Sequence, residues 1–273
     1  MKKIEIFTAL LLVVCVEVVA QKINCKTTNT CFRNNEELYY EVYYNLGPIW
    51  VAAGDVTFRV EDNKFQNQGC YKFTGNGQTF KSYDWIFKVR DKFESLVDTI
   101  SFRPLKYLRD TKEGSNATYN LNYFNNTKNV AYSFYKKNHH EFVKDTIGIT
   151  SCTYDVMTMI YYARTIDYTA YKPNEIIPIS IFLDAKVFNK QYIRYLGKAV
   201  LKTAIGTFNC IKFSPKLIAG TIFKEGDEMI VWVTDDKNKI PLLVETPIVV
   251  GSIQTKIKSI KGERHKLNKI EKK

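Results

Sequence analysis

Residues 56–60 read Val56-Thr57-Phe58-Arg59-Val60, with an apolar side chain at every second position. Successive side chains of a strand point to opposite faces of a sheet, so this period of two predicts a strand with one buried and one wet face. The same alternation recurs at residues 39–44, 85–89, 119–123, 130–134, 195–201, 208–213, 230–233 and 253–258. The repeated pattern predicts a mainly β protein.

Residues that favour turns separate several of these segments. Gly75-Asn76-Gly77 and Asn125-Asn126 tolerate positive φ, and the Asp-Asp-Lys-Asn run at 235–238 can stabilise a turn through its side chains. Short links of this kind join antiparallel neighbours. We therefore expect antiparallel sheets.

One segment, residues 151–166, breaks the alternation and predicts the principal helix. Ser151 can cap this helix. Apolar side chains recur there at the spacing of one helical face, at Cys152, Val156, Met159, Ile160 and Ala163. The helix would join two β-rich halves, about 36–148 and 176–262, of one domain that spans residues 36–262.

Asp155 and Arg164 lie nine positions apart on the predicted helix. At about 100° per residue they point to opposite faces, so they cannot pair with each other. We expect a structural role for both, in which each forms a charge-assisted bond to a different part of the sheet. A catalytic role is the alternative.

The first twenty residues have the composition of an export signal. Lys2 and Lys3 precede an apolar run, and small residues end the run at Ala20. We expect residues 1–20 to be a signal peptide cleaved before Gln21, and residues 21–35 to be an N-terminal extension; a retained anchor is the alternative. No second apolar run reaches the ~20 residues of a spanning helix, so we expect no integral membrane segment after cleavage.

The formal net charge of +12 is concentrated near the C-terminus. Residues 254–273 hold eight Lys or Arg against Glu263 and Glu271, which is half of the excess. The other basic residues form no stripe interleaved with aromatic residues, so we expect no nucleic-acid partner. We expect residues 263–273 to be a frayed basic tail; a patch that contacts anionic lipid or sugar is the alternative.

Removal of Cys15 with the signal would leave five cysteines, an odd number. Cys25 and Cys31 are close enough in sequence to close a small loop, and such a disulfide would stabilise the fold by about 2–3 kcal/mol. The alternative is that these cysteines are small buried thiols.

No pattern of catalytic or metal-binding residues stands out. His139, His140 and His265 lack metal-ligand spacing, and no Gly-x-Ser-x-Gly turn marks a nucleophile. We therefore expect no catalytic residue, no metal and no cofactor. The acidic residues between 84 and 98 could supply the paired carboxylates of a hydrolase, but such a pair is defined by its separation in space.

Aromatic side chains are abundant, with eighteen Tyr, seventeen Phe and three Trp. Most belong in the core, because aromatic side chains favour strands and fill the space between packed faces. Strands with aromatics on both faces, such as residues 39–44 and 132–135, indicate that one face lines a groove or a partner surface. The candidate ligand-binding residues are Trp50, Trp85, Trp232 and Tyr44.

Several short motifs follow each other along the chain: Tyr43 to Gly47, Ala53-Gly54, Tyr83-Asp84-Trp85, Arg103-Pro104, Glu113-Gly114, Asp155 to Arg164, Val231 to Asp236, Ile240-Pro241 and Val250-Gly251-Ser252. Their order resembles the exported bacterial domain-of-unknown-function 3108 (DUF3108) family over nearly all of residues 36–261. The resemblance implies curved antiparallel sheets that form an open barrel-like shell, in a protein of the Gram-negative cell envelope or periplasm. It implies no reaction or ligand. Physically, Gly54, Gly251 and Pro241 fit structural roles at strand bends and turns.

These observations favour an exported, non-enzymatic binding or carrier module. Its ligand would be a lipid or other apolar molecule, a glycan, or another envelope protein, held in a cleft of a curved sheet. The alternatives are an envelope hydrolase that uses paired carboxylates and a structural scaffold without a small ligand.

Overall fold

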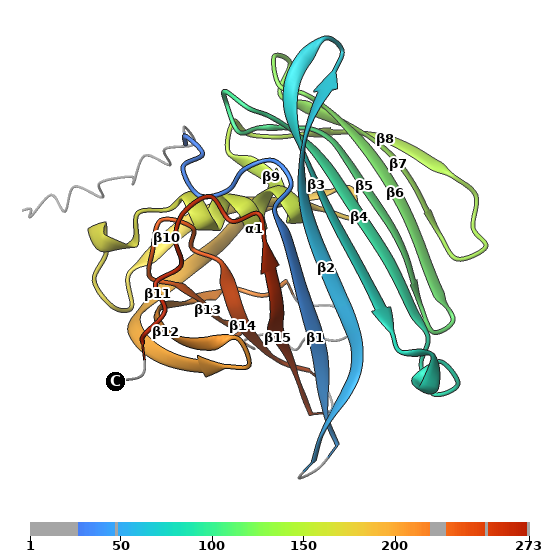
Figure 1. Ribbon diagram of the computed structural model, residues 1–273. Helices are drawn as coiled ribbons and strands as arrows, with labels where there is room; N and C mark the ends of the chain where they lie inside the picture. Colours follow the sequence, from blue (N-terminus) through green and yellow to red (C-terminus); the bar gives the residue numbers. More distant parts are fainter. Residues whose placement is uncertain (1–26, 47–48, 219–227, 249–250, 272–273) are drawn as a thin grey trace, which may run out of the picture.

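In the computed structural model the alternating segments form fifteen strands of one curved sheet (Figure 1), counted over the described residues 27–46, 49–218, 228–248 and 251–271. The strands are β1 (Glu37–Leu46), β2 (Ile49–Phe65), β3 (Gln68–Thr79), β4 (Val89–Asp98), β5 (Pro104–Glu113), β6 (Asn116–Asn125), β7 (Val130–Lys137), β8 (Val143–Gly148), β9 (Thr153–Asp155), β10 (Ile176–Leu183), β11 (Lys186–Thr203), β12 (Gly206–Pro215), β13 (Ile230–Thr234), β14 (Pro241–Pro247) and β15 (Ser252–Lys261). The predicted mainly β, open shell is confirmed.

Strands β1 and β15 pair in the middle of the sheet and join its two halves. Strands β1 to β8 follow each other outward on one side, and β15 back to β9 on the other. Among the described strands all neighbours are antiparallel except β9 and β10, which pair in parallel. The sheet ends at β8 and β9 without closing, so the two predicted halves are continuous through backbone pairing and are not joined by the helix alone.

The principal helix is α1 (Val156–Thr165), and it begins later than predicted. Asp155 caps it in place of Ser151, because the Asp155 carboxylate accepts the backbone N–H of Thr158 at 3.0 Å and its hydroxyl at 2.6 Å. Thr153–Asp155 form β9, which pairs with β10. Residues 153–155, which the helical spacing had placed in the first turn of the helix, are therefore part of a strand.

The helix lies within the curve of the sheet and contacts β3, β4, β9 and β10 (Figure 1). Phe73 of β3 stacks on Tyr161 of α1, with ring centroids 3.9 Å apart, and Phe32 packs edge-on against both rings. Gly75 permits this approach, because a Cβ there would lie 3.1 Å from the Sδ of Met157. The predicted turn at residues 75–77 is therefore wrong: these residues continue β3 beneath the helix.

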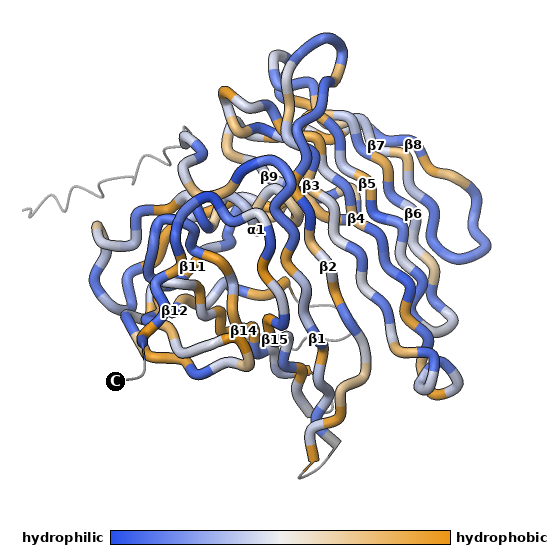
Figure 2. Tube along the Cα trace, in the orientation of Figure 1, coloured by the Kyte–Doolittle hydropathy of each residue, from blue (hydrophilic) through white to orange (hydrophobic). Residues whose placement is uncertain are grey.

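A second apolar cluster fills the other half of the shell, and its members are Leu38, Tyr40, Phe208, Cys210, Ile240, Leu242 and Ile257. They come from β1, β12, β14 and β15 and from the residue before β14. Figure 2 shows that hydrophobic and hydrophilic residues alternate along the strands. One side of each strand can therefore be buried while the other remains wet.

Residues 85–88 are not the strand that their alternation predicted. A short 3-10 turn, η1 (Lys81–Tyr83), precedes them, and β4 begins only at Val89. The N–H groups of Ile86 and Phe87 both donate to the Tyr83 carbonyl, at 2.9 and 3.1 Å. These local hydrogen bonds hold the segment as a turn and leave its large side chains outside the sheet.

The end of the chain packs on the domain where fraying was expected. The backbone N–H of His265 donates to Asn238 Oδ1 at 2.7 Å, that of Asn268 to Asp236 Oδ2 at 3.0 Å, and that of Ile270 to the Thr207 carbonyl at 2.8 Å. The turn at 235–238 thus supplies acceptors for residues 263–271. Basic composition alone gave no sign of these partners.

The predicted signal peptide, residues 1–20, lies outside the described residues. Within the part of the chain that the structure describes, no helix has the length and apolar composition needed to cross a membrane.

Candidate functional site

The face of β2 to β5 that points away from α1 carries a polar groove of about 380 Å³. Along β2, side chains that line the groove alternate with Phe58 and Val60, which pack into the core. The polar and charged side chains that line it are Asp55, Thr57, Arg59, Asn76, Gln78, Arg90, Lys92, Asp110 and Lys112. The alternation that places apolar residues inside therefore also builds this polar outer face.

A straight row of side chains crosses the groove from strand to strand, made by Thr57, Asn76, Lys92 and Asp110. Tyr39 of β1 and Tyr119 of β6 continue the row at its two ends. At about 4.8 Å per strand, the row from Tyr39 to Tyr119 spans roughly 24 Å. An extended ligand could therefore lie across several strands at once.

Strand β6 turns Tyr119 and Tyr123 outward, onto the same face as the groove, while Phe124 packs into the core. The alternation at 119–123 predicted Tyr119, Leu121 and Tyr123 as the buried side, but the structure buries Asn120 and Asn122 instead. The reason is the two-residue turn after Glu113, which pairs Glu113 with Asn116 and so sets the register between β5 and β6. In this register Tyr119 lies opposite the outward-facing Asp110, so Tyr119 faces outward too.

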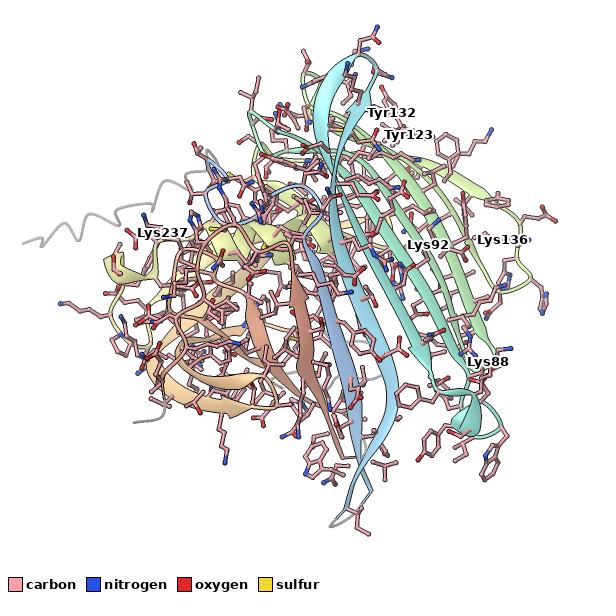
Figure 3. The ribbon with its side chains drawn as sticks, in the orientation of Figure 1. Lys88, Lys92, Tyr123, Tyr132, Lys136 and Lys237 are labelled. Carbon is pink, nitrogen blue, oxygen red and sulfur yellow. The ribbon has the colours of Figure 1, made fainter. Side chains whose placement is uncertain are left out.

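Strand β7 extends this aromatic surface toward the edge of the sheet. Tyr132 lies opposite Tyr123, and Phe134 lies opposite Leu121. Figure 3 shows Tyr123 and Tyr132 close together on this part of the sheet, with Lys92 and Lys136 on it as well. The polar row and the aromatic surface thus form one continuous surface from β2 to β7, which we call the outer face.

Charges of both signs are interspersed in the groove. Asp55 accepts from the Gln78 amide at 3.3 Å, and at the edge of the groove Arg90 pairs with Asp84 at 2.6 Å. Lys92 stands opposite Asp110 on the neighbouring strand. A surface of mixed sign does not favour a polyanion, whereas its many donors and acceptors suit a neutral, hydroxyl-rich ligand.

Asp91 lies on β4 behind the groove, with its side chain on the inner face beside Gly77 and Thr111, and its titration is strongly altered. Burial, together with the negative charge of Glu113, raises its pKa to about 7. Its carboxylate accepts the backbone N–H of Lys112 at 3.2 Å. Asp91 therefore changes charge near neutral pH, which is unusual for a carboxyl group.

Arg164 anchors one end of α1 inside the protein. Its guanidinium forms a two-pronged ion pair with the Glu36 carboxylate, at 2.5 and 2.9 Å, and donates to the Asn238 carbonyl at 3.0 Å. Both charged side chains are buried. The ion pair ties the helix to the residue before β1, and the third bond ties it to the turn between β13 and β14.

Asp155 anchors the other end of the helix. Its carboxylate accepts the hydroxyl of Ser95 on β4 at 2.5 Å, in addition to the capping bonds from Thr158. Burial raises the pKa of Asp155 although these hydrogen bonds oppose the change. Asp155 thus holds the helix to β4, and Arg164 holds it to the residue before β1 and to the turn between β13 and β14; neither lies in the groove.

The motif resemblance is confirmed by a family model. The model of DUF3108, a protein of unknown function, matches residues 39–258. The chain belongs to the DUF3108 family. No curated protein matches it at a significant level.

Two solved structures are similar to this DUF3108 protein. A beta-barrel-like protein of the domain of unknown function DUF1849 from Brucella abortus has a TM-score of 0.56 at 9% identity, covering 85% of this chain and 98% of that one. A protein with a YmcC-like fold from Bacteroides fragilis has a TM-score of 0.32 at 9% identity, covering 87% and 100%. The first similarity supports the fold.

The three tryptophans of this DUF3108 protein do not converge on one cleft. Trp50 and Trp85 are exposed, at the start of β2 and in the segment before β4. Trp232 is half-buried against the second apolar cluster, with Lys212 Nζ 5.1 Å from its ring. Tyr44 is half-buried beside Gly251. None of the four lines the groove.

Gly54, Gly251 and Pro241 lie at bends and close contacts. A Cβ on Gly54 would come within 2.2 Å of the Gln78 carbonyl oxygen, so only glycine fits between β2 and β3 there. Gly251 has a φ of +87° just before β15. Pro241 begins β14, and its carbonyl accepts the Tyr40 hydroxyl at 2.9 Å.

The structure overturns the disulfide predicted between Cys25 and Cys31. The Cys31 thiol is free and donates to the Arg164 carbonyl at 2.9 Å. Cys25 lies outside the described residues. Cys152 is disulfide-bonded, whereas Cys70 and Cys210 are buried thiols. Closeness in sequence suggested the wrong pair. The fold directs the thiol of Cys31 toward the end of α1 instead.

Sequence reasoning missed a layer of polar residues on the inner face of β5 to β7. Tyr107, Asn122 and Ser133 lie opposite one another on these strands, and all three are buried. The Tyr107 hydroxyl and the Asn122 amide form no hydrogen bond within the described residues. The alternation assigned the asparagines of β6 to the wet face, so only the register could reveal this layer.

Proposed function

We propose that this DUF3108 protein is an exported, non-enzymatic envelope protein that binds a glycan-like ligand along its outer face. The observation that carries the proposal is the outward placement of Tyr119 and Tyr123 of β6 beside the polar groove. Sugars offer hydroxyl groups on their edges and C–H groups on their faces. A row of polar side chains next to aromatic rings matches both.

Each part of the face would have its own task. Asp110 and Asn76 offer planar polar groups that can hydrogen-bond neighbouring hydroxyls. Tyr119 and Tyr123 would pack against the flat faces of sugar rings. Location in the envelope or periplasm is part of the proposal, and it rests on the lysine-led apolar leader at residues 1–20.

An acyl chain inside the shell is the less favoured ligand. The space around α1 is occupied by Phe32, Phe73 and Tyr161, whose rings contact each other. The second apolar cluster occupies the other half. The outer face offers room without displacing any of these side chains.

The proposal is tested by titrating the chain of residues 21–273, which contains every described residue, with chitohexaose and with isolated peptidoglycan sacculi. Tyr119→Ala should weaken binding at least about fivefold, since one stacked ring contributes on the order of 1–3 kcal/mol. Tyr192→Ala is the matched control, because Tyr192 is a half-buried tyrosine of β11, in the other half of the sheet. Absence of binding to both probes, or an equal loss in the control, would refute glycan binding at this face.

A hydrolase acting on the same class of ligand is the second candidate, and Asp91 favours it. A carboxyl with a pKa of about 7 is suited to general acid catalysis near neutral pH. Glu113 lies close enough to raise the pKa of Asp91 and could provide the second carboxylate on the inner face. Release of shorter sugars by the wild type, abolished in Asp91→Asn with binding retained, would decide for the enzyme.

A further inference from the structure

Four turns lie together at one end of the sheet because β1 to β8 are an antiparallel meander. The links β1–β2, β3–β4, β5–β6 and β7–β8 share this end, whereas β2–β3, β4–β5 and β6–β7 lie at the other. Figure 1 shows the start of β2 and the η1 turn at the same lower end. We call this the anchor end, and its described residues are 49–50, 80–88, 114–115 and 138–143.

Large apolar side chains are exposed at the anchor end and nearly absent from the opposite turns. The exposed ones at the anchor end are Ile49, Trp50, Trp85, Ile86, Phe87, Phe142 and Val143. The opposite turns expose a single one within the described residues, Ile100. The same sheet thus carries apolar turns at one end and polar turns at the other. Exposure to water would favour polar residues in the turns at both ends, so the apolar end needs another explanation.

The apolar side chains around η1 are held outward by a well-formed turn. The side chain of Trp85 is 83% exposed although its indole Nε1–H donates to the Ser82 carbonyl at 2.9 Å. Phe87 lies against the neighbouring β5–β6 turn, since a Cβ on Gly114 would be 2.7 Å from its ring. The indole can therefore leave water without losing a hydrogen bond, and little order has to be created on binding.

Lysine side chains accompany these apolar residues. Lys81 and Lys88 flank the η1 segment, and Figure 3 shows Lys88 at this end. Lys136 Nζ is 5.4 Å from the Phe142 ring, and Lys256 Nζ is 5.8 Å from the Trp50 ring. The carboxylate of Asp84 is already paired with Arg90, so the lysines beside η1 remain available for an external anion.

From this arrangement we propose that the anchor end docks on the surface of a lipid bilayer containing anionic phospholipids. Trp50 and the Trp85–Phe87 segment would sit at the level of the headgroups, where indole rings concentrate, and the lysines would contact phosphates. A protein partner fits less well, because lysine is depleted from the cores of protein interfaces, whereas here lysines lie between the exposed apolar side chains. The proposal is independent of ligand binding at the groove.

The test measures flotation of residues 21–273 with vesicles of phosphatidylethanolamine and 30% phosphatidylglycerol, and with vesicles of phosphatidylcholine alone. Ile86→Ser should lower the vesicle-bound to free ratio at least about threefold, and Trp85→Ser/Ile86→Ser at least about tenfold. Ile100→Ser is the matched control, because Ile100 is an exposed isoleucine, 86% accessible, on a turn of the opposite end. Circular dichroism should show that all variants keep the wild-type fold.

The anionic preference is tested with Lys81→Glu/Lys88→Glu, which should reduce binding to the phosphatidylglycerol vesicles. Blue-shifted tryptophan emission on vesicle binding, lost in Trp85→Ser, would support insertion of this turn. Failure of the wild type to float, equal binding of Ile86→Ser and wild type, or equal binding to neutral vesicles would each overturn the proposal. So would a change of oligomeric state in Trp85→Ser without any change in flotation, which would assign the anchor end to protein contacts.

Discussion

The buried ion pair between Glu36 and Arg164 allows a quantitative prediction about what holds the helix in the sheet. We consider Glu36→Gln, which keeps the size of the side chain and removes its charge. Glu37 provides a matched control on the next residue: its carboxylate pairs with Arg59 at 2.7 Å, but on the solvent side of β1. Comparison of Glu36→Gln with Glu37→Gln therefore separates burial from pairing.

The expected magnitudes differ because of exposure. The side chains of Arg164 and Glu36 are 2% and 0% accessible, whereas those of Arg59 and Glu37 are 48% and 26% accessible. Removal of one partner of a buried pair leaves an uncompensated charge and costs about 3–5 kcal/mol. An exposed pair contributes about 0–1 kcal/mol. Glu36→Gln should therefore lower the free energy of unfolding by about 3 kcal/mol or more, and Glu37→Gln by less than about 1 kcal/mol.

The assay is urea unfolding of residues 21–273, followed by circular dichroism at neutral pH. A double-mutant cycle with Arg164→Met isolates the pair: since the second substitution removes the charge that the first one stranded, the double variant should lose less than the sum of the single losses, by about 2 kcal/mol. Equal losses for Glu36→Gln and Glu37→Gln, or additive losses in the cycle, would refute the reasoning. Both would show that burial does not isolate this pair from solvent.

Two further predictions concern titration and cysteine chemistry. Burial raises the pKa of Asp91 to about 7, so its protonated form favours the folded state: its contribution to stability is complete below about pH 4 and is lost as the pH rises through 7. Urea midpoints should therefore fall less between pH 4 and 8 in Asp91→Asn than in the wild type, and an unchanged slope would contradict the pKa. Denatured without reductant, the chain should be alkylated at Cys31, Cys70 and Cys210 but not at Cys152, as read by peptide mass spectrometry; a modified Cys152 would contradict its disulfide.

Much of the fold could be predicted from local pattern. The alternation at 56–60 and 208–213 corresponds to β2 and β12, and the helical spacing between Val156 and Ala163 corresponds to α1. Each of these signals depends on neighbours a few positions away. They are therefore legible without knowledge of the rest of the chain.

The errors arose where distant contacts decide. Gly75 looks like a turn residue, but it lies within β3 because Met157 needs the space. Cys31 looked like a partner for Cys25, but its thiol meets the carbonyl of Arg164, far away in sequence. The same holds for the candidate site, since no spacing in the sequence indicates that Thr57, Asn76 and Asp110 share one row.

The sequence by itself determined the β class, the principal helix and the family, because period, composition and motif order are properties of short segments. Only the tertiary structure decided that β1 pairs with β15, that β6 turns Tyr119 and Tyr123 outward, and that exposed apolar side chains collect at one end of the sheet. The physical reason is that an alternating strand pattern defines two faces but does not tell which of them is buried. Register with neighbouring strands and packing against α1 determine which face is buried.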